Sequence, residues 1–167
     1  FGTAMIPLHQ GQVEFVGAWK EKHSTGSRKP LVTTGTLEDD LLWRDFTVNA
    51  IAASLSNERF GRIVDPLGGR EDLQATILRT PLDPAATSDD DPVRIMRAIR
   101  FAAQLGFTIE SRTRVALASM RERLAIVSQE RLTDEFLKML RTSKPSIALK
   151  LMFETGVLDI VFPEIAQ

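Results

Sequence analysis

The chain has 167 residues, of which 43% are hydrophobic and 26% are charged, and its formal net charge is −1. These values predict a folded globular protein, in which any nucleic-acid binding depends on a local basic patch rather than on overall charge. The absence of cysteine excludes a disulfide framework and a thiolate metal site, and no apolar run approaches the roughly 20 residues of a membrane span. We therefore expect a cytoplasmic protein with no membrane association.

The first residue is Phe1 rather than methionine, so we expect either a piece of a longer protein or a protein whose N-terminal part was removed. Residues 1–19 predict a β-hairpin with its turn at residues 9–12, because QVEFVGAW alternates as a half-buried strand does. Glu14 stands between apolar neighbours on this hairpin. Its carboxylate is either a metal ligand or an ordinary solvent-facing group.

The next segment, KEKHSTGSRKP, predicts a mobile loop. Its small polar residues are mixed with four cations, which are Lys20, Lys22, Arg28 and Lys29. These cations suit contacts to RNA phosphates, and a loop that is merely solvated is the alternative interpretation.

Thr36 is expected to cap a helix with an acidic first turn, and LLWRDFTVNAIAASL continues with apolar residues at helical spacing. Arg44, Asp45 and Asn49 interrupt the apolar pattern. Arg44 is a donor suited to phosphate oxygens. Asp45 and Asn49 are four residues apart, hence on one face of the expected helix, and suit hydrogen bonds to a ribose hydroxyl.

The stretch FGRIVDPLGG predicts a short strand that ends in a turn, and REDLQATILRT predicts one helical turn and a last strand. PLDPAATS then has the composition of a linker. A domain boundary is therefore expected after Leu82, between residues 1–82 and 83–167.

Residues 89–107, DDDPVRIMRAIRFAAQLGF, predict a helix with Asp91 as N-cap, Pro92 at the first helical position and Gly106 at the end. Its apolar seam is Ile95, Ala98, Ile99, Ala102 and Leu105, and its polar side is Arg94, Arg97, Arg100 and Gln104.

Asp90, Asp91 and Arg94 are expected around the first turn of this helix. A carboxylate and a guanidinium complement the amino donor and ring-nitrogen acceptor that adenine and cytosine share, whereas guanine and uracil present the reverse pattern. The alternative is that the acids cap the helix dipole and the arginines form surface ion pairs.

Three further helices are expected at residues 111–124, 128–141 and 145–155, with short joins that imply antiparallel packing. The predicted fold class is therefore α+β, with a small mixed part followed by an all-helical part.

Taken together, WRDFTVNAIA, DPLGGREDL, DDPVRIMRAIRFAAQLGF and ERLTDEFLKML resemble motifs of the class II tRNA nucleotidyltransferases and bacterial poly(A) polymerases. The resemblance covers essentially the whole chain. It implies the remnant of a polymerase-beta-like nucleotidyltransferase head, followed by a helical neck and body. It also implies a Mg²⁺-dependent enzyme that adds C or A, from CTP and ATP, to the 3′ end of tRNA or another RNA.

Residue roles follow from the same resemblance. Arg44, Asp45 and Asn49 would handle ribose and triphosphate, and Asp90, Asp91 and Arg94, with the neighbouring Arg97, would form a protein template for the incoming base. We expect these two groups to form two walls of one nucleotide pocket.

The chain also departs from the family pattern. In the family an Asp-x-Asp pair on a strand before this hairpin holds the metal ions, and these 167 residues contain no such strand. Glu14 resembles the third carboxylate, and is thus the candidate catalytic and metal-binding residue. Asp90 stands where glutamate is usual, and Trp19 and Trp43 where arginines are expected.

The predicted reaction, in an intact protein, is attack of an RNA 3′-hydroxyl on the α-phosphate of ATP or CTP with release of pyrophosphate. The chain alone is expected to be inactive. Two alternatives stay open, a poly(A) polymerase and a non-catalytic RNA-binding fragment.

Overall fold

The computed structural model describes residues 3–22 and 31–165 and contains two compact units, Phe1–Trp43 and Arg44–Gln167. In the described residues, no helix is both long enough and apolar enough to cross a bilayer.

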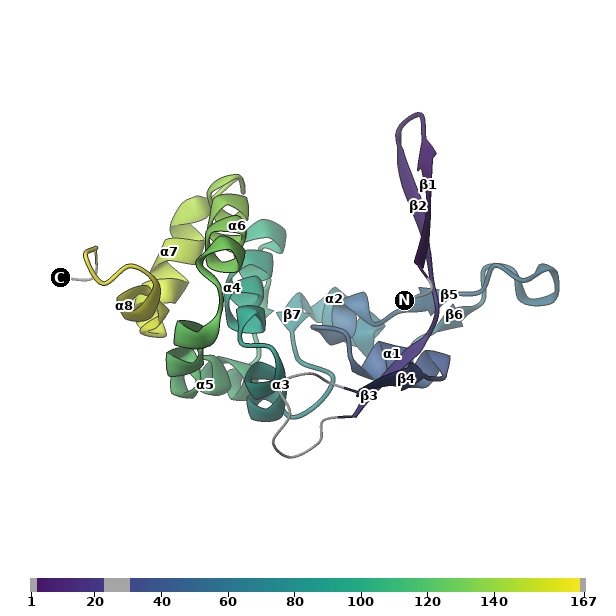
Figure 1. Cartoon of the computed structure of the whole chain (residues 1–167), viewed down its shortest axis with the longest axis horizontal. Coiled ribbons are helices and arrows are strands. Elements are labelled where there is room, and N and C mark those ends of the chain that lie inside the picture. The colour runs from purple at the N-terminus through teal and green to yellow at the C-terminus, as the bar shows by residue number, and fades with distance from the viewer. Residues whose placement is uncertain (1–2, 23–30, 166–167) are drawn as a thin grey trace. The chain divides into compact units, whose positions relative to one another are not determined.

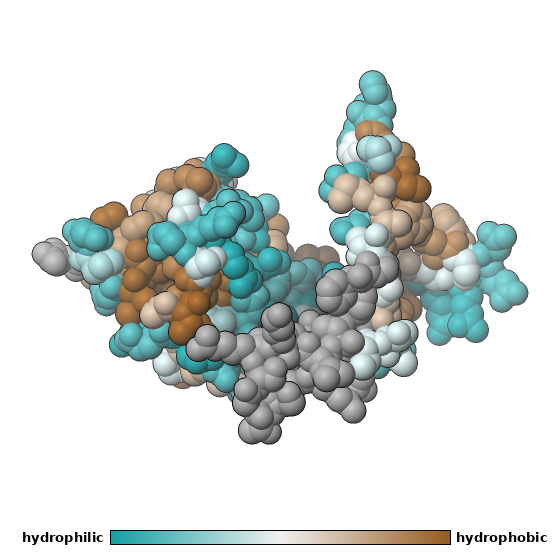
Figure 2. All heavy atoms as spheres, viewed as in Figure 1, coloured by the Kyte–Doolittle hydropathy of each residue, from teal (hydrophilic) through white to brown (hydrophobic). Residues whose placement is uncertain are grey.

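The first unit begins with the predicted hairpin, which is confirmed (Figure 1). Strand β1 (Thr3–Leu8) pairs with β2 (Gly11–Val16) in antiparallel register, with Met5 opposite Glu14. Both strands are exposed along their whole length, so the prediction of a half-buried strand is wrong. Figure 2 shows hydrophobic residues along this ribbon, and the large ones are Met5, Ile6, Leu8, Val13, Phe15 and Val16.

Strand β3 (Trp19–Lys22) pairs antiparallel with β4 (Leu31–Thr34), with Lys20 opposite Thr33. Lys20 and Lys22 therefore lie on a strand, and their assignment to a loop is wrong. Arg28 and Lys29 lie outside the described residues.

Helix α1 (Leu37–Leu42) has the predicted N-cap, since the Thr36 hydroxyl accepts a hydrogen bond from the Asp39 N–H at 3.2 Å. The predicted continuation of this helix is wrong, because α1 ends at Leu42. Beyond it, Phe46 is extended and fully buried, and the Thr47 N–H donates to the Arg79 carbonyl at 2.9 Å. Burial and this distant hydrogen bond outweigh the local helical spacing.

The second unit opens with the 3₁₀ helix η1 (Thr47–Asn49), followed by the short antiparallel pair of β5 (Ala52–Ala53) and β6 (Ile63–Val64) around η2 (Asn57–Arg59). The predicted helical turn and strand are confirmed as α2 (Gly69–Ala75) and β7 (Ile77–Leu78).

Helix α2 packs closely on η1 at Gly69. A Cβ atom at this position would lie 2.1 Å from the Thr47 carbonyl oxygen, so only glycine fits. Asp65 begins the helix by accepting the N–H groups of Gly69 and Arg70 at 2.8 and 2.9 Å. Burial raises the pKa of Asp65, but the hydrogen bonds from backbone N–H groups, foremost that of Arg70, lower it by more. The pKa of Asp65 is therefore below its usual value.

The segment predicted as a linker is instead helix α3 (Pro84–Asp90), so that prediction is wrong. Asp83 accepts the N–H groups of Ala85 and Ala86, both at 3.1 Å, and Pro84 occupies the first turn. This Asp-Pro pair is a helix start signal that the linker interpretation passed over.

The central helix is confirmed as α4 (Val93–Leu105), which ends at Gly106 with a φ of 70°. Ile95, Ala98, Ile99 and Ala102 are buried as predicted, whereas Leu105 is 46% exposed and does not belong to the seam. Pro92 takes the cap position, and no side chain caps the helix, so the N-cap assigned to Asp91 is wrong.

Strand β8 (Thr108–Ile109) pairs in parallel with β7, so residues on both sides of the predicted boundary at Leu82 share one sheet. The helical part continues with five elements, which are α5 (Ser111–Ser119), η3 (Arg121–Ile126), α6 (Gln129–Leu140), α7 (Pro145–Glu154) and α8 (Val157–Val161). The predicted helix over 111–124 is interrupted at Met120, and α8 was not predicted. Helices α6 and α7 both pack on α4 (Figure 1).

Candidate nucleotide site at the start of α4

A partly buried carboxylate joins two of the sequence motifs. Asp45 lies between α1 and η1, and its side chain is only 13% exposed. It accepts a hydrogen bond from Arg97 Nη2, and Arg94 Nε lies 3.5 Å from its Oδ1 atom. The motif around Asp45 therefore lies beside the start of α4, as expected for two walls of one site.

Asn49 lies on η1 and not on the same helical face as Asp45, because the predicted helix does not extend this far. Its side-chain oxygen accepts the Phe46 N–H at 3.0 Å, which fixes the turn that buries Phe46. Arg44 is exposed immediately before Asp45. The ribose and phosphate roles of these residues stay predictions.

Arg97 carries an unsatisfied donor. Its Nη2 atom binds Asp45, but its Nε atom is buried and has no hydrogen-bond partner in the described structure. A buried donor left without an acceptor costs about 1–3 kcal/mol. A ligand with acceptor oxygens or nitrogens at this position would recover part of that cost.

Asp91 is extended between α3 and α4, with a φ of −138° and a ψ of 93°. Its Oδ2 atom accepts a hydrogen bond from Arg131 Nη2 of α6 at 2.8 Å. Asp90 is the exposed last residue of α3. Asp91 and Arg94, the predicted base-reading pair, are therefore each held by a partner from another element, Arg131 and Asp45.

The arginines of α4 are not a plain solvated stripe. Arg100 Nε donates to Glu135 Oε2 at 2.6 Å, and Lys138 Nζ donates to Glu135 Oε1 at 3.0 Å. Burial raises the pKa of Glu135, but the hydrogen bonds from Arg100 and Lys138 outweigh it and leave the pKa below its usual value. The surface ion pairs of the alternative interpretation are here partly buried.

Sequence reasoning missed the contribution of α6. Arg131 and Glu135 both lie in the motif ERLTDEFLKML and pair with α4 or the segment before it. Their four-residue spacing, which places both on one face of a helix, was the available signal. The two contacts also show that α4 and α6 run in the same direction.

Glu14 is exposed on β2 of the first unit. Among residues 3–22 and 31–165, no three His, Cys, Asp or Glu side chains are grouped so as to hold a metal ion. The described residues by themselves thus do not make up a Mg²⁺ site. The metal-binding role of Glu14 stays a prediction.

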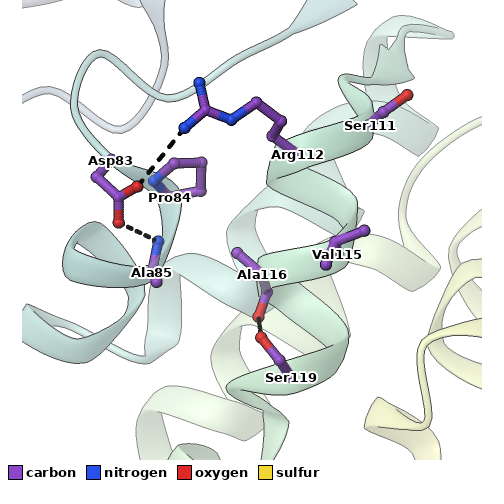
Figure 3. A pocket seen from close by; sticks show the side chains of 8 residues that line it. All are labelled: Asp83, Pro84, Ala85, Ser111, Arg112, Val115, Ala116 and Ser119. Atoms are coloured by element: carbon purple, nitrogen blue, oxygen red, sulfur yellow. Dashed lines mark hydrogen bonds and ion pairs between the residues drawn. The ribbon is translucent and has the colours of Figure 1, made fainter.

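A separate hollow of about 390 Å³ lies between the start of α3 and helix α5 (Figure 3). Its rim carries an ion pair between Arg112 and Asp83 at 3.9 Å, and its wall includes Val115, Ala116 and Ser119. None of the predicted site residues lines it.

Comparison with protein families gives two matches. The model of the poly(A) polymerase head domain matches residues 1–79, and a model described as the probable RNA and SrmB-binding site of polymerase A matches residues 106–167.

Two curated relatives align with nearly the whole chain. The tRNA nucleotidyltransferase cca2 of Schizosaccharomyces pombe is 37% identical over 163 residues, which are 96% of this chain and 33% of the relative. The CCA-adding enzyme of Geobacillus sp. (strain WCH70) is 43% identical over 159 residues, which are 93% of this chain and 38% of the relative. The chain thus spans roughly a third of the length of these relatives.

A solved structure of a tRNA nucleotidyltransferase, complexed with a primer tRNA and an incoming ATP analog, superposes with a TM-score of 0.82. It is 30% identical in sequence, and the match covers 97% of this chain and 45% of that one.

Proposed function

The chain belongs to the family of tRNA nucleotidyltransferases and poly(A) polymerases, and from this premise we propose that it carries the nucleotide-selecting part of a template-independent RNA nucleotidyltransferase. The whole enzyme would add C, A or both to tRNA 3′ ends. The RNA 3′-hydroxyl oxygen attacks the α-phosphorus of CTP or ATP and forms a phosphodiester bond. The bond between the α-phosphorus and the bridging α–β oxygen breaks, pyrophosphate leaves, and the hydroxyl proton passes to water. The divalent metal of such enzymes would supply charge neutralisation at the triphosphate, and Glu14 is proposed as one of its ligands.

The single observation that carries this proposal is the contact of Asp45 with both Arg94 and Arg97. It brings the predicted ribose and triphosphate motif to the predicted base-reading turn. We propose that a nucleotide binds where these two motifs meet, with its sugar near Asp45 and its base edge near Asp91 and Arg94.

Base choice in this site follows from hydrogen-bond polarity. Arg94 offers only donors, and ionised Asp91 offers only acceptors, so the pair matches adenine and cytosine. Guanine and uracil would place donor against donor and acceptor against acceptor. Each mismatch would cost about 1–3 kcal/mol, which is roughly tenfold to more than a hundredfold in preference.

We assign residues 1–82 to part of the head and residues 83–167 to the helical neck and RNA-binding part. The end of the head-domain match at residue 79 supports this boundary.

The proposed RNA contacts in the first part of the chain are four cations, Lys20, Lys22, Arg28 and Lys29. We also propose a cytoplasmic location, with which the lack of cysteine accords.

A poly(A) polymerase is the second candidate, because both matching family models are described by that activity. The two candidates differ in substrate and not in the proposed base-reading site. A non-catalytic RNA-binding role is the third, and it is favoured only by the lack of an acidic cluster among the described side chains.

Titration of the chain with ATP, CTP, GTP and UTP, followed by NMR chemical shifts, tests the proposal. We expect ATP and CTP to bind more tightly than GTP and UTP, with shifts centred on Asp45, Asp91 and Arg94. Equal affinities, or shifts centred elsewhere, would contradict it.

A further inference from the structure

A polar pocket lies near the C-terminal end of α4, away from the candidate nucleotide site. It has a volume of about 270 Å³ and is formed by the C-terminal halves of α4 and α6. Its lining residues are Arg100, Gln104, Lys138, Arg141 and Thr142. Three of these five are cations, and none is a carboxylate.

The neighbouring acids do not cancel this charge. Glu135 accepts from both Arg100 and Lys138, so one negative charge is shared between two cations. Asp134 lies 4.0 Å from Lys138, but its side chain is 71% exposed and is screened by water. Three positive charges less that of Glu135 leave an excess of two, which Asp134 reduces only in part.

The hydrogen bonds around the pocket also leave donors for a ligand. Arg100 Nη1 donates to Gln104 Oε1 at 2.9 Å, so the amide NH₂ of Gln104 is the group that remains for another partner. Thr142 donates its own hydroxyl hydrogen to the Met139 carbonyl at 2.8 Å and therefore offers none. A ligand in this pocket would meet donors from Gln104, Lys138 and Arg141, and it would have to be an acceptor.

The helix ends supply an ordinary reason for cations here. Helices α4 and α6 end at Leu105 and Leu140, and each C-terminus carries about half a negative charge, which cations stabilise. The two helix ends together supply about one negative charge, whereas the pocket residues carry three positive charges. Glu135 supplies one further negative charge, which is already paired with Arg100 and Lys138. Helix-end compensation therefore does not account for the whole cluster.

We propose that this pocket binds a backbone phosphate of RNA. The inference rests on the proposed function, which supplies the RNA. Arg94 and Gln104 are ten residues apart on α4, about 15 Å along its axis, with Arg97 and Arg100 between them. An RNA strand whose 3′ end reaches Arg94 would thus place a phosphate from a few nucleotides upstream at Gln104, Lys138 and Arg141.

The test measures binding of a fluorescently labelled RNA hairpin with a single-stranded 3′ end, at several salt concentrations. The variants are Lys138→Gln and Arg141→Gln. The control is Lys150→Gln, which removes a 76% exposed cation of α7 that lies 3.8 Å from Glu154. Thermal unfolding of each variant verifies that the fold is retained.

We expect each pocket variant to weaken RNA binding several-fold, equally for different RNA sequences, and to reduce the slope of log affinity against log salt by about one. The control should bind RNA as the unmodified chain does. Binding of ATP and CTP should not change in any variant, so a failure here and a failure of the proposed function give different results.

RNA affinities of the pocket variants equal to that of the control would overturn the proposal. So would a parallel loss of ATP affinity, because the pocket would then serve the triphosphate of the nucleotide. Inorganic phosphate serves as a competitor in the same assay. If it displaced the RNA at concentrations as low as those at which the RNA itself binds, the pocket would be a site for free phosphate instead.

Discussion

Arg131 of α6 donates a hydrogen bond across 2.8 Å to Asp91, a residue 40 positions earlier that begins the proposed base-reading turn. Asp91 lies between α3 and α4 with an extended backbone, and its Oδ2 atom is the acceptor of this hydrogen bond. Arg131 therefore orients the carboxylate that would accept from the amino group of the base.

Arg131→Ala is predicted to reduce the preference for ATP over GTP by roughly tenfold while changing the free energy of unfolding by less than about 1 kcal/mol. The stability change is small because the pair is half exposed. Nucleotide titration and thermal unfolding measure the two effects.

Arg114→Ala is the matched control. Arg114 pairs with Glu154 at the same 2.8 Å and with similar exposure, but on α5 and α7. A loss of preference in both variants would mean that any surface ion pair acts in this way, and would count against a positioning role for Arg131.

Glu135→Gln is predicted to lower the free energy of unfolding by about 3 kcal/mol at neutral pH, because it leaves Arg100 buried without its carboxylate. The dependence on pH follows from the lowered pKa of Glu135. A carboxyl group whose pKa is lowered by folding stabilises the fold at pH values above its ordinary pKa, which is 4.5 for Glu135. This stabilisation is lost as the pH falls through the lowered pKa of the folded state. The difference between the two proteins should therefore be full at pH 7 and shrink below about pH 4.5; a difference that grows in acid would refute this.

Gly69→Ala is predicted to destabilise the second unit by about 1–3 kcal/mol or more, because the added methyl group would overlap the Thr47 carbonyl. Gly17→Ala is the control, since a Cβ atom there meets no atom within 4 Å. Urea unfolding measures the free energy of unfolding of the two variants. Equal stability of the two variants would mean that η1 and α2 are not as closely packed as described.

The chain by itself is predicted to add no nucleotide. Its described side chains form no group of three acids for a metal, and Glu14 alone does not replace such a group. Incubation with tRNA that lacks its CCA end, Mg²⁺ and labelled ATP and CTP should give no extension. Template-free extension that depends on Mg²⁺ would show the prediction to be wrong.

Local signals in the sequence predicted those parts of the fold that local chemistry controls. Thr36 caps α1, Gly106 ends α4, and the seam through Ile95 and Ile99 is buried. The errors arise where distant contacts decide. Burial of Phe46 ended α1 early, a choice that helical spacing alone does not reveal.

The candidate site was predictable to a similar extent. The residue types and the resemblance predicted that the motif of Arg44, Asp45 and Asn49 lies beside that of Asp90, Asp91 and Arg94. They did not reveal which carboxylate meets which guanidinium, because Asp45–Arg97 and Asp91–Arg131 join positions 52 and 40 residues apart. Such pairings depend on the packing of α4 against α6 and the turn before η1, and a sequence pattern does not contain them.

The central claim is that the start of α4 selects the base, and Arg94→Ala tests it most directly. The measurement is the ratio of ATP to GTP affinity, and of CTP to UTP affinity, in the unmodified chain and in this variant, with Arg112→Ala as a control at the exposed ion pair with Asp83. We predict that Arg94→Ala brings both ratios close to one while RNA affinity falls little, and that the control keeps them. Ratios unchanged in Arg94→Ala, with nucleotide binding retained, would contradict the account and leave the arginine as a structural partner of Asp45.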